Sequence, residues 1–239
     1  MDDDLSAKIE LRAFADPAAL AQALAEAVAG DLRDAIATRG GASLAVSGGN
    51  TPKRFLQALS RQGLAWEHVV VTLVDERWVP ESHARSNTRL LRENLLQGAA
   101  AAARLLPLYR DAPEPEDALD AVEHELAALP APFDAVVLGM GDDGHTASFF
   151  PGGDRLAEAL DPAGVLRVLP MRAPGAGEPR ITLALPVLLA ARHLYLHIEG
   201  AGKRAVLERA LSAGGAGAQL PIHSLLRQAS SPASVYWAG

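Results

Sequence analysis

The sequence SLAVSGGNTP at residues 43–52 decides the fold class, because it joins a short apolar run to a glycine-rich turn and then to a helix start. Residues 43–46 have the length and apolar character of a short strand. Thr51 and Pro52 are typical of a helix N-terminus, and Phe55, Leu56 and Leu59 give the next segment an apolar face. The stretch therefore predicts a strand, a glycine loop and a helix in succession.

The same alternation extends in both directions along the chain. Residues 8–14 alternate like a half-buried strand, and Asp16-Pro17 predicts the start of a helix that Gly40-Gly41 ends. Further strands are predicted at residues 69–74, 133–138, 165–169, 181–185, 194–199 and 234–237, and further helices at 86–96, 115–129, 203–211 and 222–228. This order predicts an α/β fold with a mainly parallel sheet and helices on both faces.

Composition limits the functions that need to be considered. The 239 residues contain no long polar linker and no internal repeat, so we expect one domain over residues 1–239. Without cysteine, disulfides, thiolate nucleophiles and cysteine-ligated metals are excluded. A net charge of −7 disfavours nucleic acid as a partner. The acidic start at residues 1–4 and the lack of a long apolar run predict a soluble cytoplasmic protein with no membrane partner.

Three polar segments follow predicted strands. They are the glycine loop at residues 47–52, Asp75-Glu76-Arg77, and the segment GMGDDGH at residues 139–145. In parallel α/β sheets, ligands bind beyond the carboxyl ends of the strands. We therefore expect these three segments, all interpreted as loops, to meet at one edge of the sheet.

The glycine loop has the features of a phosphate-binding turn. Its backbone N–H groups can point into a concavity at a helix N-terminus, where the helix dipole favours an anion. The residues in question are Ser47, Gly48, Gly49, Asn50 and Thr51. An ordinary strand-to-helix turn is the alternative, since glycine and asparagine are common in turns. A P-loop is excluded, because no Gly-Lys-Ser/Thr follows.

The segment at residues 139–145 has the formal pattern G-x-G-x-x-G, but a dinucleotide site is a poor interpretation. Its two aspartates would repel a pyrophosphate, and no acidic strand end follows at the required distance. Asp143 and His145 fit acid–base chemistry better, because an imidazole can take up a proton near neutral pH. A solvated turn with an incidental histidine is the alternative.

Other candidates are weaker when taken singly. Arg77 follows a buried strand at the ligand edge and is expected to face a substrate, whereas Arg180 and Lys203 could simply be solvated. His193 and His197 do not suggest a metal site, because four strand residues separate them by roughly 13 Å. We expect no metal and no cofactor. A serine hydrolase is also disfavoured, since no G-x-S-x-G elbow is present.

Taken together, the motifs resemble the glucosamine-6-phosphate isomerase/6-phosphogluconolactonase superfamily, and specifically its lactonase branch. The resemblance rests on SGGNTP at 47–52, DERWV at 75–79, Ser86-Asn87, LGMGDDGHTASFFPG at 138–152, and Arg180-Ile181-Thr182. It implies a Rossmann-like fold and hydrolysis of 6-phospho-D-glucono-1,5-lactone to 6-phosphogluconate in the oxidative pentose phosphate pathway, without metal or nucleotide.

The resemblance also implies roles for single residues. Ser47, Gly48, Gly49, Asn50 and Thr51 would hold the phosphate, with Arg180 and Lys203 as cationic partners and Asp75 beside the substrate. His145 would transfer the proton with Asp143 as its companion, and Arg77 would lie near the lactone or the product carboxylate.

Two other functions stay open at this point. One is a sugar-phosphate isomerase or deaminase that uses a carboxylate base such as Asp75. The other is a sensor that binds a sugar phosphate without reacting with it. The expected partner in all cases is a small sugar phosphate, and we expect a monomer or a weak homodimer.

Overall fold

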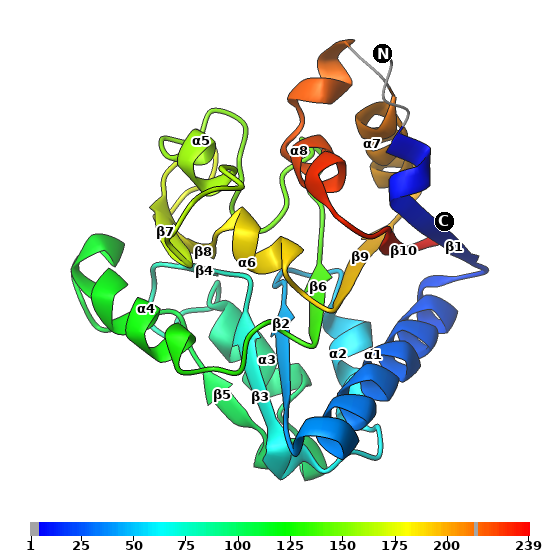
Figure 1. The fold of residues 1–239 in the computed structure, drawn as a ribbon, viewed down its shortest axis with the longest axis vertical. Coiled ribbons are helices and arrows are strands. Elements are labelled where there is room, and N and C mark those ends of the chain that lie inside the picture. Colours follow the sequence, from blue (N-terminus) through cyan, green and yellow to red (C-terminus); the bar gives the residue numbers. More distant parts are fainter. Residues whose placement is uncertain (1–4, 213–214) are drawn as a thin grey trace.

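Seven parallel strands form the main sheet of the computed structural model, which describes residues 5–212 and 215–239 (Figure 1). They are β1 (Ile9–Phe14), β2 (Ala42–Val46), β3 (Val69–Leu73), β5 (Arg104–Leu106), β6 (Ala135–Leu138), β9 (His193–Glu199) and β10 (Ala233–Ala238). Their order across the sheet is β1-β10-β9-β6-β2-β3-β5. The predicted α/β class is confirmed. Residues 1–4, whose acidity argued against a signal peptide, lie outside the described residues.

Six of the helices described by the structure form two groups of three. The α-helices are α1 (Pro17–Arg39), α2 (Lys53–Ser60), α3 (Asn87–Asn94), α4 (Leu119–Ala127), α5 (Leu156–Ala159), α6 (Leu185–Leu189), α7 (Ala201–Leu211) and α8 (Pro221–Gln228), with five short 3₁₀ turns, η1 (Leu5–Lys8), η2 (Trp66–His68), η3 (Gly98–Ala102), η4 (Pro115–Ala118) and η5 (Gly215–Gln219). Helices α1, α2 and α3 pack in succession, and α6 and α7 both contact α8. No helix in the described part of the chain is long and apolar enough to cross a membrane.

The reversal of strand order at β2 explains these two groups. From β1 the chain moves to β2, β3 and β5 in one direction across the sheet, and from β6 it returns through β9 and β10 in the other. Because parallel crossovers are right-handed, connections that run in opposite directions place their helices on opposite faces. The carboxyl ends of β2 and β6 therefore border a crevice, which is the usual ligand position in such sheets.

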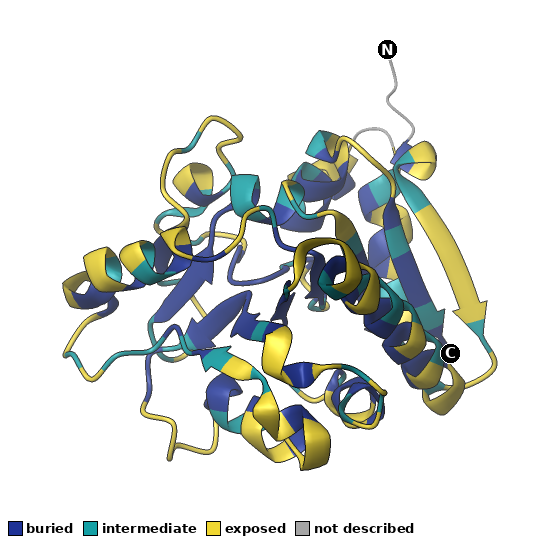
Figure 2. Cartoon of the chain, turned by 60° about the horizontal axis from the view of Figure 1, so that its bottom comes forward, coloured by how far each residue is buried: buried dark blue, intermediate teal, exposed yellow. Residues whose placement is uncertain are grey.

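The longest helix, α1, follows the sequence signals closely. The side chain of Asp16 accepts hydrogen bonds from the amides of Ala18 and Ala19, and Gly40 ends the helix in the left-handed conformation. One face of α1 is fully buried against the sheet, including Leu20, Leu24 and further apolar residues (Figure 2). The capping residues and the apolar stripe in the sequence thus predict the same helix, and the structure contains it.

A second, three-stranded antiparallel sheet was not predicted. It consists of β4 (Asp75–Arg77), β8 (Arg180–Leu183) and β7 (Val168–Met171), in the order β4-β8-β7. The interpretation of residues 75–77 as a loop was therefore wrong. Val74 carries the chain from β3 into β4: its amide donates to Val46 and its carbonyl accepts from Leu183. The small sheet grows directly out of the large one at the ligand edge.

Glu76 ties this small sheet to helix α3. Its side chain is 0% exposed and accepts hydrogen bonds from the amides of Arg77, Asn87 and Thr88 and from the hydroxyl of Ser86. Burial raises the pKa of Glu76, and the backbone donors act in the opposite direction. The carboxylate satisfies amides in the first turn of α3, which otherwise have no intrahelical partner.

We predict that Glu76→Gln lowers the free energy of unfolding by about 2–4 kcal/mol, because an amide nitrogen would face two of the donors that the carboxylate now accepts. Urea denaturation monitored by circular dichroism measures this loss. The matched control is Glu67→Gln at an exposed position, which should change stability by less than about 0.5 kcal/mol. Equal stabilities of the two variants would contradict the anchoring role of Glu76.

Candidate active site

A cavity of about 330 Å³ opens at the carboxyl ends of β2 and β6. Of the residues singled out from the sequence, it is lined by Ser47, Gly48, Gly49, Asn50, Thr51, Asp75, Arg77, His145, Arg180 and Lys203. Asp143 does not line the cavity but contacts His145. The volume suits a small ligand. The structure thus brings the polar segments together as expected from the sheet topology.

The glycine loop after β2 is hydrogen-bonded to the loop after β6. The hydroxyl of Ser47 accepts a hydrogen bond of 2.9 Å from the amide of Gly139, which links the loop after β2 to the loop after β6. A side chain on Gly48 is impossible without movement, because its Cβ would lie 1.9 Å from Oδ1 of the buried Asn87. The loop backbone therefore packs closely against α3.

The start of α2 differs from the sequence expectation in a way that matters for binding. Pro52 occupies the N-cap position, and no side chain caps the helix, so the expected cap by Thr51 is wrong. The first amides of a helix need a partner from outside the helix. At the mouth of a cavity, that partner can be an anion.

His145 is held by Asp143 within the tight loop at residues 139–145. Nδ1 of His145 lies 2.6 Å from Oδ1 of Asp143, and the same oxygen accepts a hydrogen bond from the backbone amide of His145. The ring also packs against Phe150, with centroids 4.4 Å apart. Since a carboxylate can only accept, Nδ1 carries a proton, and in the neutral ring the lone pair is on Nε2. Nε2 has no partner among the described residues.

Gly141 is the residue that makes room for this pair. A Cβ at position 141 would lie 2.3 Å from Nδ1 of His145 and 2.7 Å from Oδ1 of Asp143. The amide of Gly141 also donates to the carbonyl of His145, which closes the loop. A glycine is therefore required at this position for the observed His145–Asp143 contact.

We predict that Gly141→Ala lowers kcat about 10–100-fold, because the added methyl group displaces the imidazole by an ångström or more. Steady-state kinetics of substrate turnover measure the effect. Gly30→Ala is the control, since a Cβ there meets nothing within 4 Å. Wild-type kcat in Gly141→Ala would show that the position of the ring is unimportant.

Cationic side chains dominate the opposite wall of the cavity. Arg77 on β4 lies directly across from Arg180 on β8, and Arg85 lines the same cavity close enough to lower the pKa of Arg180. Two like charges on facing strand positions disfavour the fold unless anions compensate them. Glu178 compensates in part, since its Oε1 lies 3.0 Å from Nε of Arg85. Burial raises the pKa of Glu178, but hydrogen bonding and the three nearby arginines outweigh it and lower the pKa overall.

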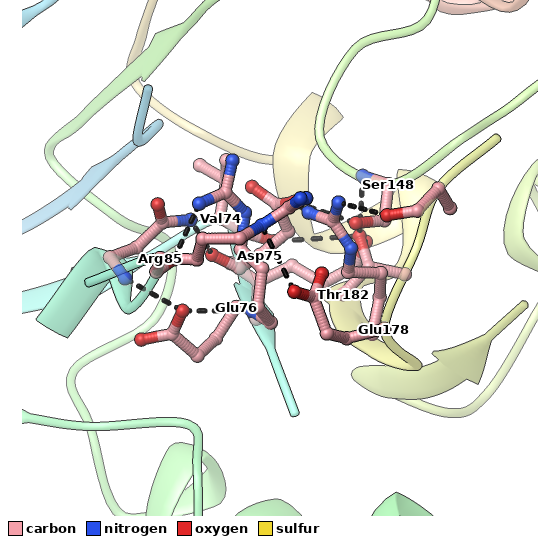
Figure 3. A network of polar contacts seen from close by, with 12 residues as sticks. Val74, Asp75, Glu76, Arg85, Ser148, Glu178 and Thr182 are labelled. Carbon is pink, nitrogen blue, oxygen red and sulfur yellow. Dashed lines mark hydrogen bonds and ion pairs between the residues drawn. The ribbon is translucent and has the colours of Figure 1, made fainter. Parts of the chain in front are cut away.

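Among residues 5–212 and 215–239, Asp75 is the one carboxylate that lines the cavity, and its side chain already has two partners. Oδ2 of Asp75 accepts a hydrogen bond of 2.6 Å from the hydroxyl of Ser148 and lies 3.9 Å from Nη1 of Arg180 (Figure 3). Arg180 is 5% exposed, donates to the carbonyl of Ala176 and stacks over Phe150. Burial lowers the pKa of Arg180, and Asp75 opposes that shift.

Several buried donors in this wall are unsatisfied. Nε of Arg77 and Nε of Arg180 are both buried and have no hydrogen-bond partner among the described residues. Buried donors without partners are rare in folded proteins and concentrate where a ligand or water completes the site. The wall is therefore positively charged and incompletely hydrogen-bonded, in a chain whose net charge is −7.

Lys203 approaches from the other side, on the first turn of α7. The helix begins after Gly200, which has a positive φ of 86° and provides no side-chain cap. Trp237 fixes this turn, because its Nε1 donates to the carbonyl of Gly200. No carboxylate of the described residues lies within ion-pair distance of the Lys203 ammonium.

Two ionisable residues of the cavity wall were not assigned from the sequence. Arg85 lies on an irregular segment between β4 and α3, where a lone arginine gives no signal. His197 was considered only as a metal ligand. It lines the cavity, whereas His193 on the same strand is half exposed and lies 3.6 Å from Asp31. No cluster of three or more potential metal ligands occurs in residues 5–212 and 215–239.

Comparison with known proteins agrees with the arrangement of these residues. Residues 15–237 match the family described as glucosamine-6-phosphate isomerases/6-phosphogluconolactonase. A 6-phosphogluconolactonase from Rhizobium meliloti (strain 1021) is 56% identical over 94% of this chain and 97% of its own length. A 6-phosphogluconolactonase from Pseudomonas aeruginosa is 46% identical over 98% of this chain and 96% of its own.

Solved structures extend the agreement to three dimensions. A 6-phosphogluconolactonase from Shewanella baltica OS155 superposes with a TM-score of 0.92 at 39% identity, over 97% of this chain and 98% of that chain. A monomeric glucosamine-6-phosphate deaminase, at 17% identity and a TM-score of 0.74, shares the fold. Both the sequence match and the fold cover nearly the whole chain, and the chain therefore belongs to the glucosamine-6-phosphate isomerase/6-phosphogluconolactonase family.

Proposed function

We propose that this protein hydrolyses 6-phospho-D-glucono-1,5-lactone to 6-phospho-D-gluconate in the oxidative pentose phosphate pathway. The observation that carries the proposal is the His145–Asp143 pair, 2.6 Å apart, whose free Nε2 belongs to a ring that lines a cation-walled cavity. Relatives with 56% and 46% identity carry the name 6-phosphogluconolactonase. In this proposal the enzyme is cytoplasmic, is a monomer or weak homodimer, and binds neither nucleic acid nor membrane.

The two ends of the cavity suit the two ends of the substrate. Residues 47–51 and Lys203 form what we call the phosphate end, where the uncapped start of α2 and a free ammonium meet. A phosphate dianion there gains backbone N–H donors and a full positive charge. In this proposal Arg180, which faces Arg77 from the neighbouring strand, is a further cation for the phosphate. The lactone carbonyl then lies toward His145 and Arg77.

His145 acts as the general base in this mechanism. Its Nε2 removes a proton from water while the water oxygen attacks C1 of the lactone, which gives a tetrahedral intermediate. Asp143 keeps the proton on Nδ1 and stabilises the imidazolium that forms, as in other histidine–carboxylate pairs. The imidazolium then returns the proton to O5 as the C1–O5 bond breaks, so that the ring opens and the base is regenerated.

Arg77 stabilises the negative charge that develops on the carbonyl oxygen. A fixed cation with an unpaired buried Nε offers a donor that the ground state of the free protein does not use. The same side chain can bind the carboxylate of the product. A δ-lactone is an activated ester, so base and cation suffice without a covalent acyl-enzyme.

The deaminase alternative requires Asp75 as a free carboxylate base. In the structure, Asp75 is 7% exposed and accepts a hydrogen bond from Ser148 beside Arg180. These contacts favour a role for Asp75 in holding Arg180 and Ser148 next to the substrate. The geometry therefore supports hydrolysis better than proton abstraction by Asp75.

We predict that His145→Ala lowers kcat about 10²–10⁴-fold with little change in the affinity for 6-phosphogluconate, because only proton transfer is lost. Asp143→Asn should lower kcat by a smaller factor, since the imidazole ring of His145 remains but is less well oriented. Initial rates with fresh lactone, corrected for spontaneous hydrolysis, measure both effects. Near-normal turnover by His145→Ala would remove this residue from the mechanism.

We predict that Arg180→Ala and Lys203→Ala mainly raise KM for the phosphorylated lactone, at a cost of roughly 1.5–3 kcal/mol of binding for a lost charge-assisted contact. Part of the loss can appear in kcat, because phosphate binding also positions the ester. Unphosphorylated gluconolactone is the control substrate. If KM rises equally for both substrates, the two residues are structural and do not bind phosphate.

A further inference from the structure

The phosphate end borders a second histidine–carboxylate pair, which the proposed hydrolysis does not use. His197 on β9 is 2% exposed, lines the cavity, and packs edge-on against Phe55 of α2. Its Nε2 lies 3.2 Å from Oε1 of Glu199. Its Nδ1 is buried and has no partner among the described residues. Packing alone does not explain a polar ring at this position, because an apolar ring would leave no nitrogen unpaired.

The direction of the hydrogen bond follows from the charge on Glu199. The contact with His197 lowers the pKa of Glu199, and this effect outweighs burial. Glu199 is therefore ionised at neutral pH and can only accept. Nε2 of His197 must therefore carry the proton and donate a hydrogen bond to the Glu199 carboxylate.

Glu199 has a competing partner that it does not contact. Lys203 follows four residues later, and its charge and that of Arg54 both attract the Glu199 carboxylate. Among the residues that the structure describes, neither cation lies within 4 Å of a Glu199 oxygen, whereas His197 does. The Lys203 ammonium consequently stays unpaired at the cavity wall. An ion pair with Glu199 would partly neutralise it and would compete with a phosphate.

Hydrogen bonds hold the backbone between Glu199 and Lys203. The amide of Gly200 donates to Ala238, and its carbonyl accepts from Trp237. Arg204, next to Lys203, stacks over the ring of Trp237 at 5.2 Å. The hydrogen bond from His197 is thus the contact that selects the orientation of the Glu199 carboxylate.

We propose that His197 is a positioning residue that holds Glu199 away from Lys203 and so keeps the Lys203 ammonium free for the substrate phosphate. The inference rests on the proposed function, because it takes Lys203 as a phosphate ligand. It assigns His197 no contact with the reacting atoms. Its effect should therefore appear mainly in KM for a phosphorylated substrate, with kcat changed only as far as phosphate binding positions the ester.

The test compares four variants on phosphorylated and unphosphorylated gluconolactone. His197→Phe should raise KM for the phosphorylated lactone about tenfold, the equivalent of one hydrogen bond, with a smaller change in kcat, and should leave KM and kcat for the unphosphorylated lactone unaffected. His197→Gln should restore most of the affinity, since its amide nitrogen can donate to Glu199. The double variant His197→Phe/Glu199→Gln should also recover wild-type KM, because the competing charge is gone. Glu199→Gln alone should leave KM at or slightly below the wild-type value, because His197 already holds the Glu199 carboxylate away from Lys203.

Each outcome decides the inference. An unchanged KM in His197→Phe, an equal loss on both substrates, or a failure of Glu199→Gln to rescue the double variant would overturn it. If His197→Phe does not fold, a rise in KM for Glu199→Gln alone would overturn it as well, since it would show that Glu199 assists binding. Lys203→Ala distinguishes a failure of the proposed function from a failure of this inference. An unchanged KM in Lys203→Ala contradicts the phosphate site itself. A raised KM in Lys203→Ala with an unchanged KM in His197→Phe contradicts only the role of His197.

Discussion

The parallel pairing of β2 with β6, at the point where the strand order reverses, is the constraint on which the rest of this structure depends. The loops that follow these two strands meet because the helices after them leave toward opposite faces. The hydrogen bond from the amide of Gly139 to the hydroxyl of Ser47 joins the two loops directly. The glycine loop and the histidine loop are thereby held in one fixed relation.

The charged side chains next to these two loops are arranged to bind an anion, at a cost to the stability of the fold. Arg77 and Arg180 face each other across the small antiparallel sheet, with unpaired donors on both. Glu76, fully buried below them, has the opposite task of holding α3 in place. Folded proteins commonly place such unfavourable contacts at functional sites, where a bound anion can relieve them. The arginine wall is the clearest example in this chain.

Much of the fold could be predicted from the sequence because the local signals agree with the tertiary structure. The cap at Asp16, the end of α1 at Gly40 and the apolar strands after them all appear in the structure. Strands near β7 and β8 were expected at residues 165–169 and 181–185, whereas β4 was expected to be a loop. The pairing of these three strands in a separate antiparallel sheet could not be predicted, because short strands carry no local signal for their partners. The start of α2 was wrong for a related reason: Thr51 has the right side chain for a cap, but the helix begins after Pro52.

The residues themselves predicted the candidate site only where several polar residues stand together in the sequence, whereas Arg180 and Lys203, which stand alone, were assigned through the family resemblance. The segments with Ser47 and His145 carry several polar residues each, and both line the cavity. Arg85 and His197 are single residues whose importance comes from their neighbours in space and, for His197, from burial. Nothing in the strand that contains His197 distinguishes a pocket residue from a core residue until its unpaired nitrogen and its contact with Glu199 are seen.

The central claim is that this cavity hydrolyses a phosphorylated sugar lactone. The most direct measurement is the rate at which the purified wild-type protein consumes fresh 6-phosphogluconolactone, compared with spontaneous hydrolysis and with release of ammonia from glucosamine 6-phosphate. The account predicts lactone consumption far above background and no ammonia. Ammonia release would favour the deaminase, and binding of 6-phosphogluconate with neither reaction would contradict an enzymatic role.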